Sequence, residues 1–171
     1  NNGWFNICKL LDTEKETYPR GFPYEHRHKK VDLVQQNVEK SIGLNEGMWI
    51  RDPDVDAISW LVSPTKGRSF VGNSFVLSTN TWAPVNTQNT SVKKEYIPAY
   101  YFLPMQTQAS GLAIDRYGDI FSGYYVQKII KQSGDAIRFG TPVLDHNRNA
   151  HNYLKDAYHE MGGLMALEEI I

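Results

Sequence analysis

Two arginines lie seven positions apart in the segment YPRGFPYEHR, where Pro19 and Pro23 stiffen the chain. Proline fixes its own backbone φ angle and keeps the residue before it out of the helical region. The guanidinium groups of Arg20 and Arg27 are therefore carried on extended or turn-forming backbone. Because an arginine fork matches phosphate or carboxylate oxygens in pairs, the two groups could converge on one polyanion. The alternative is that Arg27 and its basic neighbours form a surface turn ahead of a helix.

Alternating carboxylates occur in the segment RDPDVDA, at Asp52, Asp54 and Asp56. Such carboxylates can converge on a hard cation such as Mg²⁺ or Mn²⁺. Helix initiation is a competing explanation, because Asp52 can cap a helix whose first residue is Pro53 and whose first turn carries Asp54. This second interpretation predicts a short helix that ends near Val62.

Two further polar groups stand where predicted elements begin or end. Asp119, in RYGDIFSG, opens a predicted helix, where it can cap the helix or act in a cleft as a general base or electrostatic group. His146 follows a predicted strand, and the ends of strands are where α/β proteins usually bind ligands. With Arg148 two positions further on, His146 could ligate a metal beside an arginine that holds phosphate. The alternative for both residues is a solvated loop.

The spacing of apolar residues predicts strands that alternate with helices. Strands are expected at 4–11, within 68–79 and at 137–144, and helices over 31–42, from 119 up to Gly134, and from 153 onward. The last helix would carry on one side Leu154, Ala157, Tyr158, Met161 and Met165, and Gly162-Gly163 could break it. This alternation predicts an α/β fold, and the lack of repeats and linkers predicts a single domain over residues 1–171.

Composition narrows the function classes. Lys and Arg number 18 against 19 Asp and Glu, so no overall field attracts nucleic acid, and we expect no nucleic-acid partner. Cys8 is the only cysteine, which excludes an intrachain disulfide framework and slightly favours a reducing compartment. No apolar run is long enough to span a bilayer, so we expect a cytoplasmic protein without a transmembrane segment. Dinucleotide-binding, P-loop, zinc-protease and nucleophile-elbow motifs are absent from the sequence.

Six segments, taken in order, carry a resemblance to a known family: RGFPYEHR, GMWIRDPDVDA, APVNTQN, IPAYYFLPM, IDRYGDIFSGYYVQKI and LDHNRNAHNYLKD. Their order and approximate spacing, over roughly residues 4–160, resemble the reversibly glycosylated polypeptide family, which includes the UDP-arabinopyranose mutases. The resemblance implies the C-terminal half of a GT-A-like nucleotide-sugar fold. It also implies a UDP-sugar partner, a divalent cation (Mn²⁺ or Mg²⁺) whose aspartate ligands lie upstream of this chain, and self-glycosylation on an arginine.

The resemblance also implies roles for individual residues. In the family the first arginine of the RGFPYEHR segment becomes glycosylated and the second is also required, and these positions fall on Arg20 and Arg27. A family pair of adjacent acids keeps only Asp119 here, because Gly118 replaces the other. His146 falls where such folds place a histidine near the diphosphate and the metal. The implied substrate contacts are Trp49 as a stacking face, Asp54 and Asp56 at sugar hydroxyls, Asn89 as the family's asparagine, Arg116, and Arg148 at the diphosphate.

The sequence therefore favours a UDP-sugar pyranose/furanose mutase or a glycosyltransferase, with Arg20, Arg27 and Asp119 as catalytic residues and His146 at the metal. The first alternative is a non-catalytic sugar-binding or assembly subunit, in a homo- or hetero-oligomer, which Gly118 and the absent aspartate run would support. A third reading is a metal-dependent nuclease or phosphatase that uses Asp54, Asp56 and His146.

Overall fold

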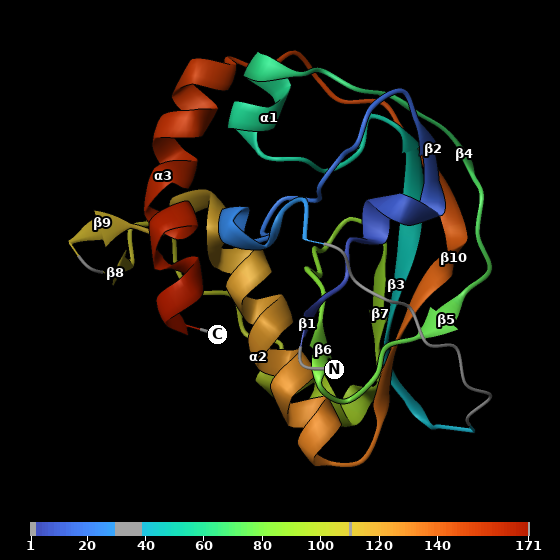
Figure 1. Ribbon diagram of the computed structural model, residues 1–171. Helices are drawn as coiled ribbons and strands as arrows, with labels where there is room; N and C mark the ends of the chain where they lie inside the picture. Colours follow the sequence, from blue (N-terminus) through green and yellow to red (C-terminus); the bar gives the residue numbers. More distant parts are fainter. Residues whose placement is uncertain (1–2, 30–38, 110, 171) are drawn as a thin grey trace.

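A six-stranded mixed sheet forms the centre of the computed structural model, which describes residues 3–29, 39–109 and 111–170 (Figure 1). Its two long strands are β3 (Ile42–Arg51) and β10 (Ala136–His146), and they run parallel to each other. Shorter strands pair antiparallel around them: β2 (Leu11–Thr13), β4 (Gly67–Phe70), β5 (Phe75–Val76) and β7 (Thr90–Val92). The predicted α/β class is confirmed, with a sheet of mixed rather than parallel strands.

Three α-helices and several short elements complete the described chain. The α-helices are α1 (Ala57–Val62), α2 (Gly118–Gln132) and α3 (Tyr153–Ile170). Single 3₁₀ turns are η1 (Ile7–Leu10), η2 (Tyr24–His26), η3 (Lys94–Ala99) and η4 (Asp115–Tyr117). Two small pairs stand apart from the main sheet: β1 (Gly3–Trp4) with β6 (Thr81–Trp82), and β8 (Gln108–Ala109) with β9 (Leu112–Ala113). In the described ranges, no helix is both long and apolar enough to cross a membrane.

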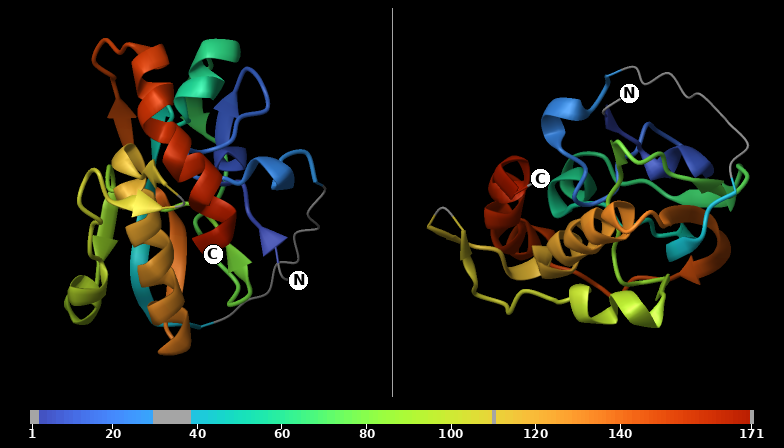
Figure 2. Two further views of the ribbon diagram at one scale, coloured as in Figure 1. Left: turned by 90° about the vertical axis from the view of Figure 1, so that its left-hand side faces the viewer. Right: turned by 90° about the horizontal axis from the view of Figure 1, so that it is seen from below.

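The parallel pairing of β3 and β10 brings two polar loops together. Arg51, the last residue of β3, is in register with His146, the last residue of β10. The carboxyl ends of the two strands therefore meet at one edge of the sheet, and the segments that follow them leave from that edge. Helix α2 begins on the same side of the molecule and runs back along the sheet, as Figures 1 and 2 show. Sequence segments more than 60 positions apart thus share this edge.

Helix α2 is buried on both sides. Its Val126 and Ile130 pack with Leu44, Ile137 and Phe139 of the sheet in one apolar cluster. Its Ile120, Phe121 and Tyr124 form a second cluster against η4 and α3, together with Ile114, Tyr117, Ala166 and Leu167. The predicted helix from 119 to Gly134 is confirmed, because Gly134 ends it with a φ angle of +87°.

Helix α3 runs through Gly162-Gly163 without a break. A Cβ atom at Gly163 would lie 2.2 Å from the Tyr117 ring, and one at Gly162 would lie 2.0 Å from the Ala113 carbonyl oxygen. The two glycines therefore allow the helix to approach η4 and β9 closely. The predicted apolar side is not the buried one, because Leu154 and Tyr158 are 73% and 78% exposed while Asp156 and Glu160 face the protein.

Three other expectations need correction. The predicted strand at 4–11 contains a 3₁₀ turn, because the Asn6 side chain caps it by accepting a 3.0 Å hydrogen bond from the Cys8 amide. Helix α1 starts later than predicted, because Asp56 rather than Asp52 is its N-cap. Most of the helix expected at 31–42 lies outside the described residues, and its last residue, Ile42, opens β3.

Candidate functional site

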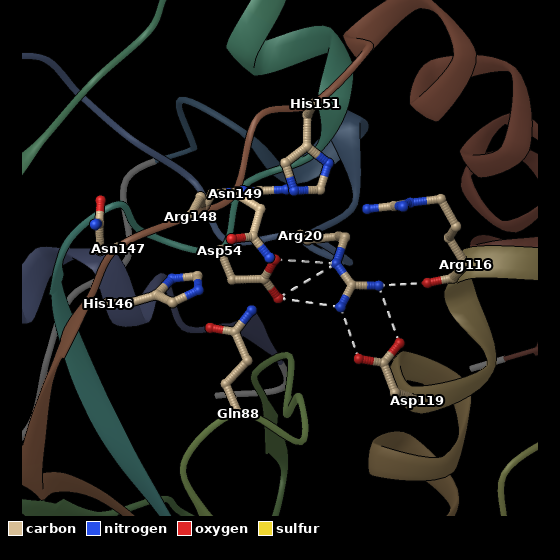
Figure 3. A pocket seen from close by; sticks show the side chains of 10 residues that line it. All are labelled: Arg20, Asp54, Gln88, Arg116, Asp119, His146, Asn147, Arg148, Asn149 and His151. Carbon is tan, nitrogen blue, oxygen red and sulfur yellow. Dashed lines mark hydrogen bonds and ion pairs between the residues drawn. The ribbon is translucent and has the colours of Figure 1, made fainter.

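A polar pocket of about 350 Å³ lies at the carboxyl edge of β3 and β10 (Figure 3). Side chains from five segments line it: Arg20, Asp54, Gln88, Arg116, Asp119, His146, Asn147, Arg148, Asn149 and His151. Six of the ten residues proposed from the sequence are among them. The structure thus brings together Arg20, Asp54, Arg116, Asp119, His146 and Arg148, and it does not bring Arg27 to this pocket.

Arg20 is presented to the pocket by a tight turn. The Phe22 amide donates to the Pro19 carbonyl at 3.0 Å, and Gly21 in the turn has a φ angle of +87°, which is the geometry of a type II turn. A Cβ atom at Gly21 would lie 2.5 Å from the Ile120 side chain, so glycine also permits contact with α2. The Tyr124 hydroxyl then donates to the Gly21 carbonyl at 2.8 Å, which fixes the turn on that helix.

The Arg20 guanidinium lies between two carboxylates, and this arrangement is visible in Figure 3. Its Nε donates to both Asp54 oxygens at 3.2 Å, and its Nη2 lies 3.1 Å from Asp54 Oδ2 and 2.6 Å from Asp119 Oδ2. Its Nη1 donates to Asp119 Oδ1 at 2.9 Å and to the Arg116 carbonyl oxygen. Asp54 is the more buried carboxylate, with a side chain 5% exposed against 20% for Asp119. Asp119 therefore faces the pocket while Asp54 anchors the guanidinium from behind.

The two carboxylates keep Arg20 charged. Burial alone would lower the pKa of the Arg20 guanidinium, but the negative charges of Asp54 and then Asp119 outweigh it and raise that pKa well above its usual value. One guanidinium with two ionised carboxylates leaves a net negative charge. Such a cluster suits contact with a carbon that develops positive charge, as the anomeric carbon of a sugar does when its leaving group departs.

Asp54 is held by a polar network behind the pocket. The Asn86 side chain donates to Asp54 Oδ2 at 3.0 Å, and the Asn86 carbonyl accepts from the Thr90 hydroxyl at 2.5 Å. The Thr90 hydroxyl also lies 2.5 Å from Oε2 of Glu46, which is fully buried. Burial raises the pKa of Glu46 well above its usual value, which favours the neutral acid at this position.

Arg148 contributes unpaired nitrogens to the opposite wall. Its Nε and Nη1 atoms are buried and have no hydrogen-bond partner in the described part of the chain. Its backbone amide donates to Asp52 Oδ2 at 2.9 Å, and its guanidinium lies 5.5 Å from the centre of the Trp60 ring. A buried cationic nitrogen without a partner is costly, and an anionic ligand in the pocket would supply the missing acceptor.

His146 stands beside this wall with one ring nitrogen engaged. Its Nδ1 lies 2.7 Å from the Asp52 carbonyl oxygen. Because a carbonyl oxygen only accepts, the hydrogen is on Nδ1 and the Nε2 lone pair remains for a ligand. The Asp52 carboxylate pairs with the Lys66 ammonium. Burial by itself would raise the pKa of Asp52, but the bonds from Lys66 and from the Arg148 amide outweigh burial and lower it.

A metal centre cannot be built from the described residues alone. They contain no group of three or more His, Cys, Asp or Glu side chains able to hold an ion. His146 can supply one nitrogen ligand, while Asp54 is committed to Arg20 and Asp56 caps α1. The predicted divalent cation with ligands upstream of this chain stays a prediction.

Arg27 and Asp56 form a pair outside the pocket. Arg27 Nη2 lies 2.6 Å from Asp56 Oδ2, and the guanidinium stacks on the Tyr24 ring at 3.6 Å. Asp56 is completely buried and also accepts from the Tyr24 hydroxyl and the Ser59 amide. The pair therefore links the turn that carries Arg20 to the start of α1. The two guanidiniums therefore do not converge on one ligand as expected. Arg27 instead forms an ion pair with Asp56 that supports the site.

Trp49 and Asn89 also lie outside the pocket lining. Trp49 is 1% exposed in the sheet core, so no sugar can stack on it in this conformation. The Asn89 side chain donates to the Met48 and Pro142 carbonyls at 3.0 and 2.9 Å and thereby bridges β3 and β10. The asparagine of the APVNTQN segment that reaches the site is Asn86, three positions earlier.

Sequence reasoning missed several pocket residues. Asn147, Asn149 and His151 belong to the DHNRNAHN loop, and Gln88 belongs to APVNTQN. Both segments are among the six that carry the family resemblance. The polarity of each whole segment indicated a site, but no single residue in it stood out. Gly118 is explained sterically, because a Cβ atom there would lie 2.8 Å from the Leu103 carbonyl oxygen. The Leu103 backbone therefore leaves no room at Gly118 for the acid expected beside Asp119.

The fold and the site define an α/β protein with a polar, arginine-containing pocket at the carboxyl edge of its sheet. The sequence profile of the family described as "Reversibly glycosylated polypeptide" matches residues 11–171, and the chain belongs to this family. UDP-arabinopyranose mutase 3 from Arabidopsis thaliana is 29% identical over 90% of this chain and 39% of its own length. Probable UDP-arabinopyranose mutase 2 from Solanum tuberosum is 28% identical over 98% of this chain and 43% of its own. This chain therefore spans less than half the length of these relatives.

Proposed function

We propose that this chain forms the sugar-diphosphate side of the active site of a UDP-sugar pyranose/furanose mutase, on the C-terminal half of a GT-A-like fold. The observation that carries the proposal is the Arg20 guanidinium held between Asp54 and Asp119 at a pocket whose opposite wall holds the unpaired Arg148 nitrogens. The names of the relatives support a mutase, because they are called UDP-arabinopyranose mutases.

Arg20 is the proposed acceptor of the sugar. A guanidinium nitrogen forms a bond to the anomeric carbon as the bond from that carbon to the diphosphate oxygen breaks, and UDP leaves with the bonding electrons. The nitrogen loses one proton in this step. Asp119 is the proton acceptor, because its Oδ2 lies 2.6 Å from Arg20 Nη2 and its side chain is the more exposed of the two carboxylates. The reverse sequence returns the sugar to UDP.

Arg148 and Arg116 are the proposed contacts of the diphosphate, and His146 is the proposed contact of a cation beside it. Arg148 has two buried nitrogens without a partner among the described residues, and the Nε2 lone pair of His146 can bind a cation but cannot donate to a phosphate oxygen. Arginine forks bind phosphate oxygens in pairs, so two guanidiniums can neutralise the charge that UDP gains as it leaves. A divalent cation bound by upstream ligands and His146 would add to this neutralisation.

A non-catalytic sugar-binding subunit is the second candidate. The observation that favours it is Gly118, which replaces the acid expected beside Asp119 and where a Cβ atom would lie 2.8 Å from the Leu103 carbonyl oxygen. Such a subunit would bind a UDP-sugar without exchanging its ring form. The nuclease or phosphatase alternative has no comparable support, because Asp56 does not line the pocket with Asp54 and His146.

The test is ring-form exchange by the full-length protein supplied with a UDP-pentose and Mn²⁺, followed by chromatography of the two ring forms and of free UDP. A mutase interconverts the forms without net loss of UDP-sugar, a transferase releases UDP, and a binding subunit does neither. Arg20→Lys should abolish exchange, because lysine keeps the charge but cannot span two carboxylates. The matched control is Arg68→Lys, which alters an exposed ion pair with Glu14 away from the pocket. Exchange by Arg20→Lys at the wild-type rate would refute the proposal.

A further inference from the structure

His151 is a pocket residue that none of the roles above uses. It lies in the loop between β10 and α3, and its ring enters the pocket from the side opposite Gln88 (Figure 3). Its Nδ1 lies 2.8 Å from Asp156 Oδ2. An ionised carboxylate can only accept, so the hydrogen of a neutral ring is on Nδ1 and the Nε2 lone pair is left for the pocket.

The orientation of the His151 ring is fixed by Tyr153 and Asp156. His151 stacks on Tyr153 with ring centres 6.0 Å apart and an interplanar angle of 14°, and Tyr153 stacks on Trp60 in turn. Asp156 is 9% exposed and also pairs with Arg116, whose Nη1 lies 3.2 Å from Asp156 Oδ1. One buried carboxylate therefore positions two pocket side chains at once.

The surrounding charged groups leave His151 as the pocket's best proton carrier. Arg116 and Arg148 stay cationic at neutral pH, Asp54 is bonded to Arg20, and Asp119 is already the proposed acceptor of the proton that Arg20 loses. Behind Arg116, Glu160 accepts from the Ala57 amide and from the Arg116 Nε atom. His146 is the other imidazole, but its Nδ1 faces a backbone carbonyl. Only His151 has a carboxylate behind it to stabilise an imidazolium, the arrangement found in acid–base histidines.

We propose that His151 is the acid–base residue of ring-form exchange, an assignment that rests on the proposed mutase function. In this exchange the bond from the anomeric carbon to the ring oxygen breaks, and a bond forms from the same carbon to the oxygen of another hydroxyl group of the sugar. The hydroxyl loses a proton and the released ring oxygen gains one. His151 Nε2 accepts the first proton and donates the second, so no further reactant is consumed. Asp156 stays ionised and balances the transient imidazolium.

The experiment compares two variants of the full-length protein, each of which keeps one of the two contacts that the His151 ring makes. His151→Gln keeps a polar contact with Asp156, and His151→Phe keeps the stack on Tyr153. Both should slow exchange of a UDP-pentose by about 10²–10⁴-fold, while the dissociation constant of the UDP-pentose, measured by calorimetry, changes less than about threefold. The matched control is His159→Gln, because His159 makes a similar 3.0 Å contact with Asp115 from α3 but does not line the pocket.

Each outcome separates this assignment from the function on which it rests. Exchange by His151→Gln within tenfold of the wild-type rate would refute the acid–base role alone. Equal losses of UDP-pentose binding and exchange would make His151 a structural residue and would likewise overturn the role. A wild-type protein that binds the UDP-pentose without exchanging it would refute the proposed mutase function, and this assignment with it.

Discussion

The cluster of Arg20 with Asp54 and Asp119 predicts a specific non-additivity in stability. Neutralising either carboxylate leaves one guanidinium with one carboxylate, which is still a balanced pair. Each of Asp54→Asn and Asp119→Asn loses part of a set of charge-assisted hydrogen bonds, although the asparagine oxygen can still accept. We expect each single change to cost about 1–2 kcal/mol of the free energy of unfolding.

The double variant leaves Arg20, whose side chain is 10% exposed, without any counter-charge. An uncompensated buried charge costs about 3–5 kcal/mol, in addition to the lost hydrogen bonds. The double change should therefore exceed the two single losses together by about 3–5 kcal/mol, against roughly 0.5 kcal/mol for independent sites.

The assay is urea unfolding of the wild type, both single variants and the double variant at pH 7. Glu14→Gln serves as control, because its ion pair with Arg68 is exposed and should contribute less than about 1 kcal/mol. Strict additivity of the two changes within about 0.5 kcal/mol would refute the claim that the carboxylates share one buried charge.

Three further predictions concern other parts of the molecule. Burial lowers the pKa of Lys131 from its usual 10.5 to about 8, so between these values the unfolded state binds more protons and stability should rise with pH. Urea unfolding as a function of pH should show a rise of about 3 kcal/mol for the wild type, and Lys131→Met should lose it. Gly163→Ala should destabilise the protein by about 2–3 kcal/mol in thermal unfolding, because the new methyl group would meet the Tyr117 ring, and an unchanged midpoint would contradict this packing. Cys8 is 2% exposed and burial raises its pKa, so thiol reagents should modify it only after denaturant is added.

The sequence predicted the elements whose signals are local. Helix α2 has apolar residues at helical spacing and ends at a glycine, and β10 is an apolar run ahead of a polar loop, so both were predicted close to their observed bounds. The start of α1 was wrong because Asp52 and Asp56 are both competent caps. Only the tertiary contacts of Asp52 with Lys66 and Arg148 decide between them.

The sequence predicted which segments contribute to the site, but it did not predict which side chains contact one another there. Arg20, Asp119 and His146 were selected from separate segments, and the parallel pairing of β3 with β10 is what brings their segments to one edge. Spacing along the chain cannot show that Arg27 turns toward Asp56, since that depends on a left-handed glycine in the intervening turn. The exposed apolar side of α3 was misleading for a related reason: Asp156 and Glu160 are buried because they hold Arg116 and His151.

The most direct test of the central claim is to locate the covalently bound sugar. The full-length protein is incubated with an isotopically labelled UDP-pentose and Mn²⁺, digested, and sequenced by tandem mass spectrometry. The account predicts the added sugar mass on Arg20, with none on Arg27, and its loss in Asp119→Asn. Label on Arg27 or on any residue outside the pocket, with Arg20 unmodified, would contradict it.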